Sequence, residues 1–308
     1  MQIEIYAYEL PLTLPRLING TALERRQGFY INIDGAWGEI APLPGSSLQE
    51  VQQDLQEACQ RLRQGLAHDA AIAAVQFGLD CALANISTAA WAADDSAPSL
   101  PLLEGPRDPI VRAWRCRRVH PTRAWLTLTG NVQYDAGLVR ELCLLAPNVR
   151  LVLDAGGRLD SEQLSALWQR IDGSRIDWLL DPSLDIPTGQ QLAEQYQLPV
   201  AFDLARYHAE SGVMARLPRF EQLKAVVLRP AELGGLATCR QLIEQARLKG
   251  LEVMVADSLQ SGLGQRQLAR LSQQWNPDTQ AALGRCNYLL DSGINDQGQP
   301  HLTGLTPI

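Results

Sequence analysis

Three aspartates and one arginine each stand at the end of a short apolar segment in the second half of the chain. Asp154 closes one such segment, Asp181 directly follows the next, Asp203 closes a third, and Arg229 directly follows a fourth. Segments of this length and composition are typical of strands buried on both faces of a parallel sheet. In α/β barrels the carboxyl ends of the strands build the active site, so the pattern predicts that the four charged side chains share one polar centre. The alternative is that each aspartate only begins a turn or caps a helix, positions that Asp favours.

Strand and helix patterns alternate from about residue 99 onward. The expected strands are 99–103, 124–129, 150–154, 176–180, 199–202, 225–228 and 252–256, with helices such as 135–146, 161–170, 189–196, 236–248 and 264–273 between or after them. Seven such units favour a (β/α) barrel over an open doubly wound sheet, which periodicity alone does not exclude. A glycine-rich GxGxxG or P-loop motif follows none of these strands, which counts against nucleotide binding.

The first hundred residues carry a different pattern, typical of an α+β domain. Residues 2–10 alternate, 17–27 read as a polar loop, and 28–34 with 36–40 form a hairpin turned at Asp34 and Gly35. Two helices follow, 47–65 with Ser47 as its N-cap and a buried one over 70–86. The polar tail after residue 277 is expected to fold back onto this region.

Composition limits the classes of partner. The 308 residues include 27 Lys and Arg against 34 Asp and Glu, a net charge of −7 without a basic stripe, so neither nucleic acid nor an anionic membrane is expected as a partner. The six cysteines lack metal-ligand or disulfide spacing and are expected to be reduced core residues. The N-terminal residues do not resemble a signal peptide and no apolar run approaches about 20 residues, so we expect a cytoplasmic protein. Its oligomeric state is open and compatible with a monomer.

Several segments of the sequence resemble segments of one known family. They are WGEIAPLPG at 37–45, AVQFGLDCALA at 74–84, LDA at 153–155, VLRP at 227–230 and SLQSGLG at 258–264. Together they resemble the o-succinylbenzoate synthases of the enolase superfamily over essentially the whole chain. The resemblance implies a (β/α)7β-type TIM barrel over 98–285, an N-terminal α+β capping domain over 1–97, and a C-terminal tail over 286–308 that returns to the cap.

The resemblance also implies a reaction and a metal. The family is a group of lyases that dehydrate 2-succinyl-6-hydroxycyclohexadiene carboxylate to o-succinylbenzoate in menaquinone biosynthesis, with Mg²⁺ held by carboxylates at three successive strand ends. Asp154 and Asp203 match the first and third ligand. At the second position stands Leu180, followed by Asp181, whose side chain should point the other way unless the strand end is bulged. We therefore expect magnesium to bind weakly here, if Asp181 does not replace the missing ligand.

The family's catalytic lysines have no counterpart in this sequence. The family's Lys-x-Lys motif aligns with Leu126-Thr127-Leu128, and shifting the alignment by one residue places threonines at the two lysine positions instead. Arg229 stands where the family has its sixth-strand lysine; it keeps the charge but, with a pKa above about 12, cannot act as a general base. His208, five residues after Asp203, is the histidine retained as a catalytic candidate.

Ser258, Ser261 and Gly262 align with positions where the family binds the substrate carboxylate. One expectation is therefore an anion-binding site near Arg229, and the other is an ordinary loop that leads into a helix. The leading hypothesis is an o-succinylbenzoate synthase homologue with lost or greatly reduced activity, a pseudoenzyme. The alternatives are a non-catalytic or repurposed homologue that binds a small-molecule carboxylate, and a different metal-assisted lyase or racemase on the same scaffold.

Overall fold

The structure is a computed structural model that describes residues 1–18, 21–86, 99–207, 212–303 and 305–308. Contacts divide the chain into two compact units. The first unit comprises 1–99, 228–244 and 255–308, and the second comprises 100–227 and 245–254. Within the described ranges, no helix is long and apolar enough to cross a bilayer.

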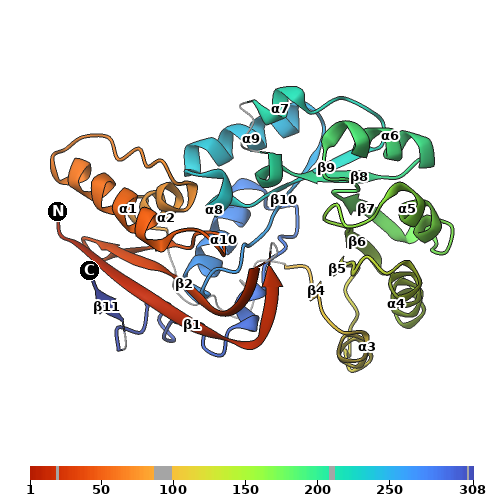
Figure 1. The fold of residues 1–308 in the computed structure, drawn as a ribbon, viewed down its shortest axis with the longest axis horizontal. Coiled ribbons are helices and arrows are strands. Elements are labelled where there is room, and N and C mark those ends of the chain that lie inside the picture. The colour runs from red at the N-terminus through yellow and green to blue at the C-terminus, as the bar shows by residue number, and fades with distance from the viewer. Residues whose placement is uncertain (19–20, 87–98, 208–211, 304) are drawn as a thin grey trace. The chain divides into compact units, whose positions relative to one another are not determined.

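The first unit is built on an antiparallel sheet of four strands. Their order is β11 (Thr306–Pro307), β1 (Ile3–Ile18), β2 (Thr21–Ile33) and β3 (Ala36–Ile40), with β1 and β2 forming the long ribbon drawn in red in Figure 1. The hairpin turn predicted at Asp34 and Gly35 is confirmed: both have positive φ, 49° and 91°, as a tight two-residue turn requires.

The polar loop expected over 17–27 is wrong, because β2 already begins at Thr21. Glu24, Arg25 and Gln27 in this stretch are exposed on the β1–β2 ribbon, whereas Arg26 is buried. Gln27 pairs with Glu9 across the two strands, and its Nε2 donates to Glu9 Oε2 at 2.7 Å. Polarity therefore marked a solvated strand face here rather than a loop.

Two helices cover this sheet, and both were predicted. In α1 (Leu48–Arg63) the N-cap Ser47 accepts a hydrogen bond from the Glu50 N–H at 3.3 Å. Helix α2 (Ala73–Leu83) lies so close to β3 that a Cβ on Gly38 would stand 2.0 Å from the Gly78 carbonyl oxygen. Glycine at both positions permits this approach. The buried side chains of the two helices join those of the sheet in one core cluster.

Later segments complete the first unit. They are α8 (Pro230–Leu233), the first part of α9 (Leu236–Leu248), α10 (Gly262–Trp275) and the 3-10 helix η4 (Arg285–Tyr288). The tail returns along β1: the Leu290 N–H donates to the Pro11 carbonyl at 2.8 Å, and β11 pairs with the start of the same strand.

The second unit contains a seven-stranded sheet in the order β10-β9-β8-β7-β6-β5-β4, parallel in each pair from β4 to β9. Its strands are β4 (Leu102–Leu103), β5 (Arg123–Thr127), β6 (Arg150–Asp154), β7 (Ile176–Leu180), β8 (Val200–Asp203), β9 (Leu223–Leu228) and β10 (Glu252–Val255). Its helices are α3 (Arg107–Arg115), α4 (Val132–Leu145), α5 (Ser161–Trp168), α6 (Ile186–Tyr196) and α7 (Val213–Arg216), with 3-10 helices η2 (Gly173–Arg175) and η3 (Leu204–Tyr207). Helix α3 was not predicted.

One ion pair shows that this sheet curls. Strands β5 and β10 have four others between them in the sheet order. In a flat sheet they would lie roughly 24 Å apart. Arg123 of β5 nevertheless reaches Glu252 of β10, Nη1 to Oε1, at 2.7 Å. The amino ends of the two strands therefore meet across the concave side, as in a barrel.

The strand register decides which side chains line that concave side. Residues paired between parallel strands point to the same face, so Arg123, Trp125 and Thr127 share the concave face. On the opposite face Phe202 meets helix α6, where a Cβ on Gly189 would lie 2.9 Å from its ring. Deep in the concave face the rings of Trp125 and Trp178 meet edge to face with centroids 6.0 Å apart. Large aromatic side chains therefore fill the interior below the strand ends.

Candidate functional site

The layer of side chains at the carboxyl ends of the strands reads Thr127, Asp154 and Leu180. The register pairs Thr127 with Asp154 and Asp154 with Leu180, so all three point to the concave face. Leu126 and Leu128 point to the opposite face and are buried. The threonine register, not the leucine register, therefore supplies the interior positions of β5. The Thr127 hydroxyl donates to Glu104 Oε1 at 3.2 Å.

Asp181 turns into the same region by leaving the strand. Strand β7 ends at Leu180, and Asp181 adopts a left-handed backbone with φ of 47°, a conformation that Asp tolerates better than most residues. Its side chain is 1% exposed. Its Oδ1 accepts from the Asp203 N–H at 3.0 Å and from the Tyr207 hydroxyl at 3.4 Å. A backbone twist, rather than a bulge, thus brings this carboxylate beside the end of β8.

Arg206 is the cation that faces Asp181. Its Nε lies 3.0 Å from Asp181 Oδ2, and its Nη1 donates to the Gly156 carbonyl at 3.0 Å. Burial raises the pKa of Asp181 to about 8, and the Asp203 carboxylate adds to the rise, while Arg206 lowers it. The guanidinium therefore offsets only part of the cost of burying this carboxylate.

Arg158 plays a similar part beside Asp154, four residues earlier in the chain. Its Nη1 donates to the carbonyls of Leu128, Asp154 and Ala155 at 3.3, 3.3 and 3.1 Å, and lies 4.0 Å from Asp154 Oδ1. The guanidinium lies over Gly156, where a Cβ would stand 3.0 Å from its Nη1. The missing side chain at Gly156 gives the arginine its place.

The three carboxylates do not fit a magnesium ion in this arrangement. Across the described residues, no group of three or more His, Cys, Asp and Glu side chains is placed to hold a metal. Both oxygens of Asp181 already interact with protein donors, and Leu180 stands where a third oxygen would be needed beside Asp154. Magnesium requires a near-octahedral set of oxygens at about 2.1 Å.

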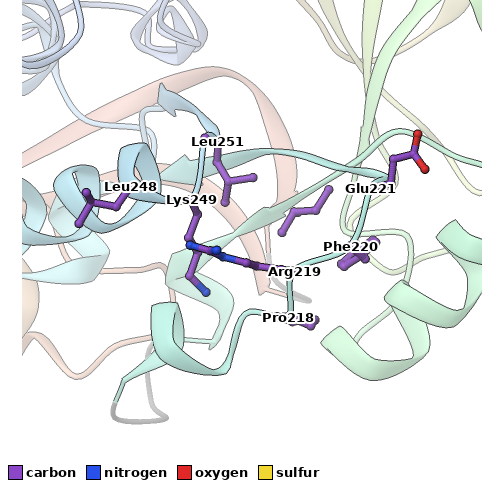
Figure 2. A pocket seen from close by; sticks show the side chains of 9 residues that line it. Pro218, Arg219, Phe220, Glu221, Leu248, Lys249 and Leu251 are labelled. Carbon is purple, nitrogen blue, oxygen red and sulfur yellow. The ribbon is translucent and has the colours of Figure 1, made fainter.

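Both lysines of the sequence lie at the other end of the strands. Lys224 is the second residue of β9, and its Nζ donates to the Glu221 carbonyl at 2.7 Å. Lys249 stands just before β10 and donates to the Leu217 carbonyl at 2.7 Å. Figure 2 shows Lys249 beside Arg219 in a pocket of about 510 Å³ formed by the segments that precede β9 and β10. Burial, and then Arg219, lower the pKa of Lys249.

The remaining predicted residues lie in the first unit. Arg229 precedes α8 and donates through Nη1 to the Asp257 carbonyl. The Ser258 hydroxyl donates to Glu232, and its N–H donates to Gln260 Oε1 at 2.7 Å. Arg229 directly follows β9 and Ser258 lies in the segment after β10, and both are hydrogen-bonded to neighbouring groups of the first unit.

Ser261 and Gly262 begin helix α10, and a buried carboxylate meets them there. Glu39 of β3 is 2% exposed. Its Oε1 accepts from the Tyr8 hydroxyl at 2.6 Å and the Ser261 N–H at 2.8 Å, and its Oε2 accepts from the Ser261 hydroxyl at 2.8 Å and the Gly264 N–H at 2.7 Å. The Gly262 N–H donates to the Ser292 carbonyl at 2.7 Å. The donors predicted for a ligand carboxylate thus bind groups of the chain itself.

The predicted roles of these residues stay predictions. His208, predicted as a catalytic candidate, lies outside the residues that the structure describes. Sequence reasoning missed Arg158, Arg206 and Glu39. A signal existed for the two arginines, since they follow Asp154 and Asp203 by four and three residues, within reach of the strand end that each aspartate closes.

Comparison with known proteins places this geometry in context. Residues 1–86 match the family model described as the N-terminal domain of MenC. The chain is 28% identical over 303 residues to the o-succinylbenzoate synthase of Pasteurella multocida strain Pm70, covering 90% of this chain and 87% of that protein. The resemblance stated from the sequence is confirmed.

Solved structures establish the fold. MenC from Desulfotalea psychrophila LSv54 superposes with a TM-score of 0.72 at 16% identity, over 94% of this chain and 95% of that one. The o-succinylbenzoate synthase from Thermosynechococcus elongatus BP-1, described as complexed with Mg in its active site, gives a TM-score of 0.70 at 19% identity, over 96% and 97%. The predicted fold class, a (β/α)7β-type barrel with an N-terminal α+β capping domain, is confirmed.

Proposed function

We propose, from the premise that this chain is a homologue of the o-succinylbenzoate synthases with the fold of the enolase superfamily, that it has lost or greatly reduced the dehydration reaction of those enzymes. The observation that carries the proposal is the strand-end layer of Thr127, Asp154 and Leu180 on the concave face. One ionisable group stands in that layer, where the reaction implied by the family needs both a base and a charged metal ligand.

The chemistry explains why this layer matters. Removing a proton next to a carboxylate requires a base with a pKa near neutrality and a cation beside the developing negative charge. A threonine hydroxyl is too weak a base and a leucine has no charge. Roughly 13 Å of strand separates Lys224 from the last residue of β9. Neither lysine of the chain lies where the proton would be removed.

The proposed ligand is a small carboxylate, held without turnover. Arg229 supports this part of the proposal, since a guanidinium binds carboxylates through two parallel N–H donors and keeps its charge at any physiological pH. The Mg²⁺ expected from the family has no role in this proposal, because the carboxylates at the strand ends do not fit a magnesium ion. A racemase or another lyase on this scaffold would need the same base, so no observation favours that alternative.

A turnover assay tests the proposal. Purified protein is incubated with 2-succinyl-6-hydroxycyclohexadiene carboxylate, with and without Mg²⁺ or Mn²⁺, and formation of o-succinylbenzoate is compared with the uncatalysed rate. The Pasteurella multocida relative serves as the active control, and circular dichroism shows that the protein is folded. We expect no acceleration above background. Metal-dependent turnover would overturn the proposal.

A matched variant tests the reason for the loss. Thr127→Lys with Leu180→Glu and Arg229→Lys puts the ionisable groups of the family into the interior register seen here. Leu126→Lys with the same two changes is the control, since residue 126 points to the other face of the sheet. Activity gained by the first variant and not by the second would support the register argument, and the reverse would contradict it.

A further inference from the structure

The three strand-end aspartates are accompanied by arginines of the same chain. We propose that Arg206 and Arg158 are the resident cations of this centre, and that they replace a divalent metal ion there. The centre defined by Asp154, Asp181 and Asp203 would then be complete without any metal.

Arg206 carries the first step of the argument. Asp181 is buried, and a buried carboxylate must be paired with a cation and hydrogen-bonded if it is to remain charged. Arg206 lies within 3.0 Å of one oxygen, while the Asp203 N–H at 3.0 Å donates to the other. Protein donors therefore already occupy the oxygens that a metal would need. The same guanidinium holds the Gly156 carbonyl at 3.0 Å, which fixes it to the loop after β6.

Arg158 carries the second step. Its contacts with three backbone carbonyls at 3.1–3.3 Å fix the guanidinium above the ends of β5 and β6, with Asp154 Oδ1 at 4.0 Å. A side chain at residue 156 would meet it, since a Cβ there comes within 3.0–3.1 Å of its guanidinium atoms. Gly156 has φ of 53°, so a glycine here both adopts the left-handed turn and leaves room for the Arg158 guanidinium.

Charge and position together favour two fixed cations over an ion. Two guanidinium groups supply two positive charges, as one divalent ion would, but each is attached to backbone carbonyls of the loops that hold the aspartates. Leu180 sits beside Asp154 in the register and offers no oxygen. Replacing a metal by arginines preserves the electrostatic balance of the buried carboxylates and removes the open coordination positions that a metal-assisted reaction uses.

This inference deepens the proposed function and rests on it. It is therefore tested by metal binding and thermal unfolding, and not by enzymatic turnover. Mn²⁺ binding is followed by electron paramagnetic resonance of the free ion, and thermal unfolding is measured with and without Mg²⁺. The proteins are the wild type, Asp154→Asn, Leu180→Glu, the triple variant Leu180→Glu/Arg158→Gln/Arg206→Gln, the same triple variant with Asp154→Asn, and Arg170→Gln as a control arginine exposed on the surface.

We expect the wild type, Asp154→Asn and Arg170→Gln to bind Mn²⁺ equally weakly, with no shift in unfolding temperature that depends on Asp154. The triple variant should gain one saturable Mn²⁺ site and a Mg²⁺-dependent rise in unfolding temperature, both lost again with Asp154→Asn, whereas Leu180→Glu alone, which keeps both arginines, should gain neither. Stoichiometric binding by the wild type that Asp154→Asn abolishes would overturn the proposal, and so would a site gained by Leu180→Glu alone or a folded triple variant that gains no site. If the triple variant does not fold, the comparisons of the wild type with Asp154→Asn and with Leu180→Glu decide.

Discussion

The buried carboxylate of Glu39 should be one of the most sensitive positions of the first unit. Four donors converge on it, two on each oxygen, at 2.6–2.8 Å. Two of them are backbone N–H groups at the start of α10, where an isosteric amide cannot serve. Whichever way a glutamine at residue 39 is turned, its NH2 group faces either the Ser261 N–H or the Gly264 N–H.

The magnitude follows from that geometry. Glu39→Gln removes the charge from the remaining bonds and leaves one buried backbone N–H opposed by another donor. A hydrogen bond to a charged group contributes about 1.5–3 kcal/mol, and an unsatisfied buried donor costs about 1–3 kcal/mol. We therefore expect the free energy of unfolding to fall by about 3 kcal/mol, with little change in side-chain volume.

Urea unfolding, followed by circular dichroism, provides the measurement. Glu9→Gln is the matched control, because Glu9 lies on the same sheet in an exposed ion pair with Arg25 and should cost at most about 1 kcal/mol. A double-mutant cycle of Glu39→Gln with Ser261→Ala should show coupling between the two sites. A loss for Glu39→Gln no larger than that for Glu9→Gln would refute the reasoning.

Two further predictions concern alkaline pH and glycine packing. Burial raises the pKa of the Cys59 thiol from 9.0 to about 11. The folded-state pKa of this thiol is thus above its unfolded-state pKa. The stability that the buried thiol contributes is therefore complete below about pH 9 and is lost as the pH rises through about 11. Cys59→Ala should therefore flatten the decline in unfolding free energy across that window by up to about 2–3 kcal/mol in urea titrations at stepped pH, and an unchanged slope would count against it. Gly78→Ala places a Cβ 2.6 Å from the Glu39 carbonyl oxygen and should destabilise by about 1–3 kcal/mol. Gly137→Ala in α4 would meet no atom within 4 Å beyond the helix's own neighbouring backbone and should stabilise by about 0.5–1 kcal/mol. Thermal unfolding of the two variants checks the contrast, and equal shifts would contradict it.

The sequence predicts the parts of this fold that depend on local pattern. Helix α1 could be predicted because its apolar residues recur on one face and Ser47 precedes them, and the strands of the curled sheet because each apolar run ends at a charge or turn signal. The stretch 17–27 was misread because a strand with one solvated face can be as polar as a loop.

The contents of the candidate site depend on features that no local pattern contains. Periodicity could not choose between Leu126 and Thr127 as the interior residue, since a shift of one position exchanges the two faces of a strand. The left-handed turn at Asp181 and the reach of Arg206 back to it arise from packing between successive strands and loops. Their detection required the register and the backbone path.

The division of the chain also bears on how the protein is made. Glu39 belongs to β3, which leaves the ribosome before the second unit, yet its partner Ser261 lies 222 residues further along. At translation rates of about 5–20 residues per second, that carboxylate waits roughly 10–45 s for its partners. The second unit, all of it encoded in between, can collapse during this interval, whereas the N-terminal sheet must stay unfinished until α10 emerges. A chain whose translation stalls just before residue 261 therefore contains the whole second unit, whereas its first unit has no helix N-terminus to receive Glu39.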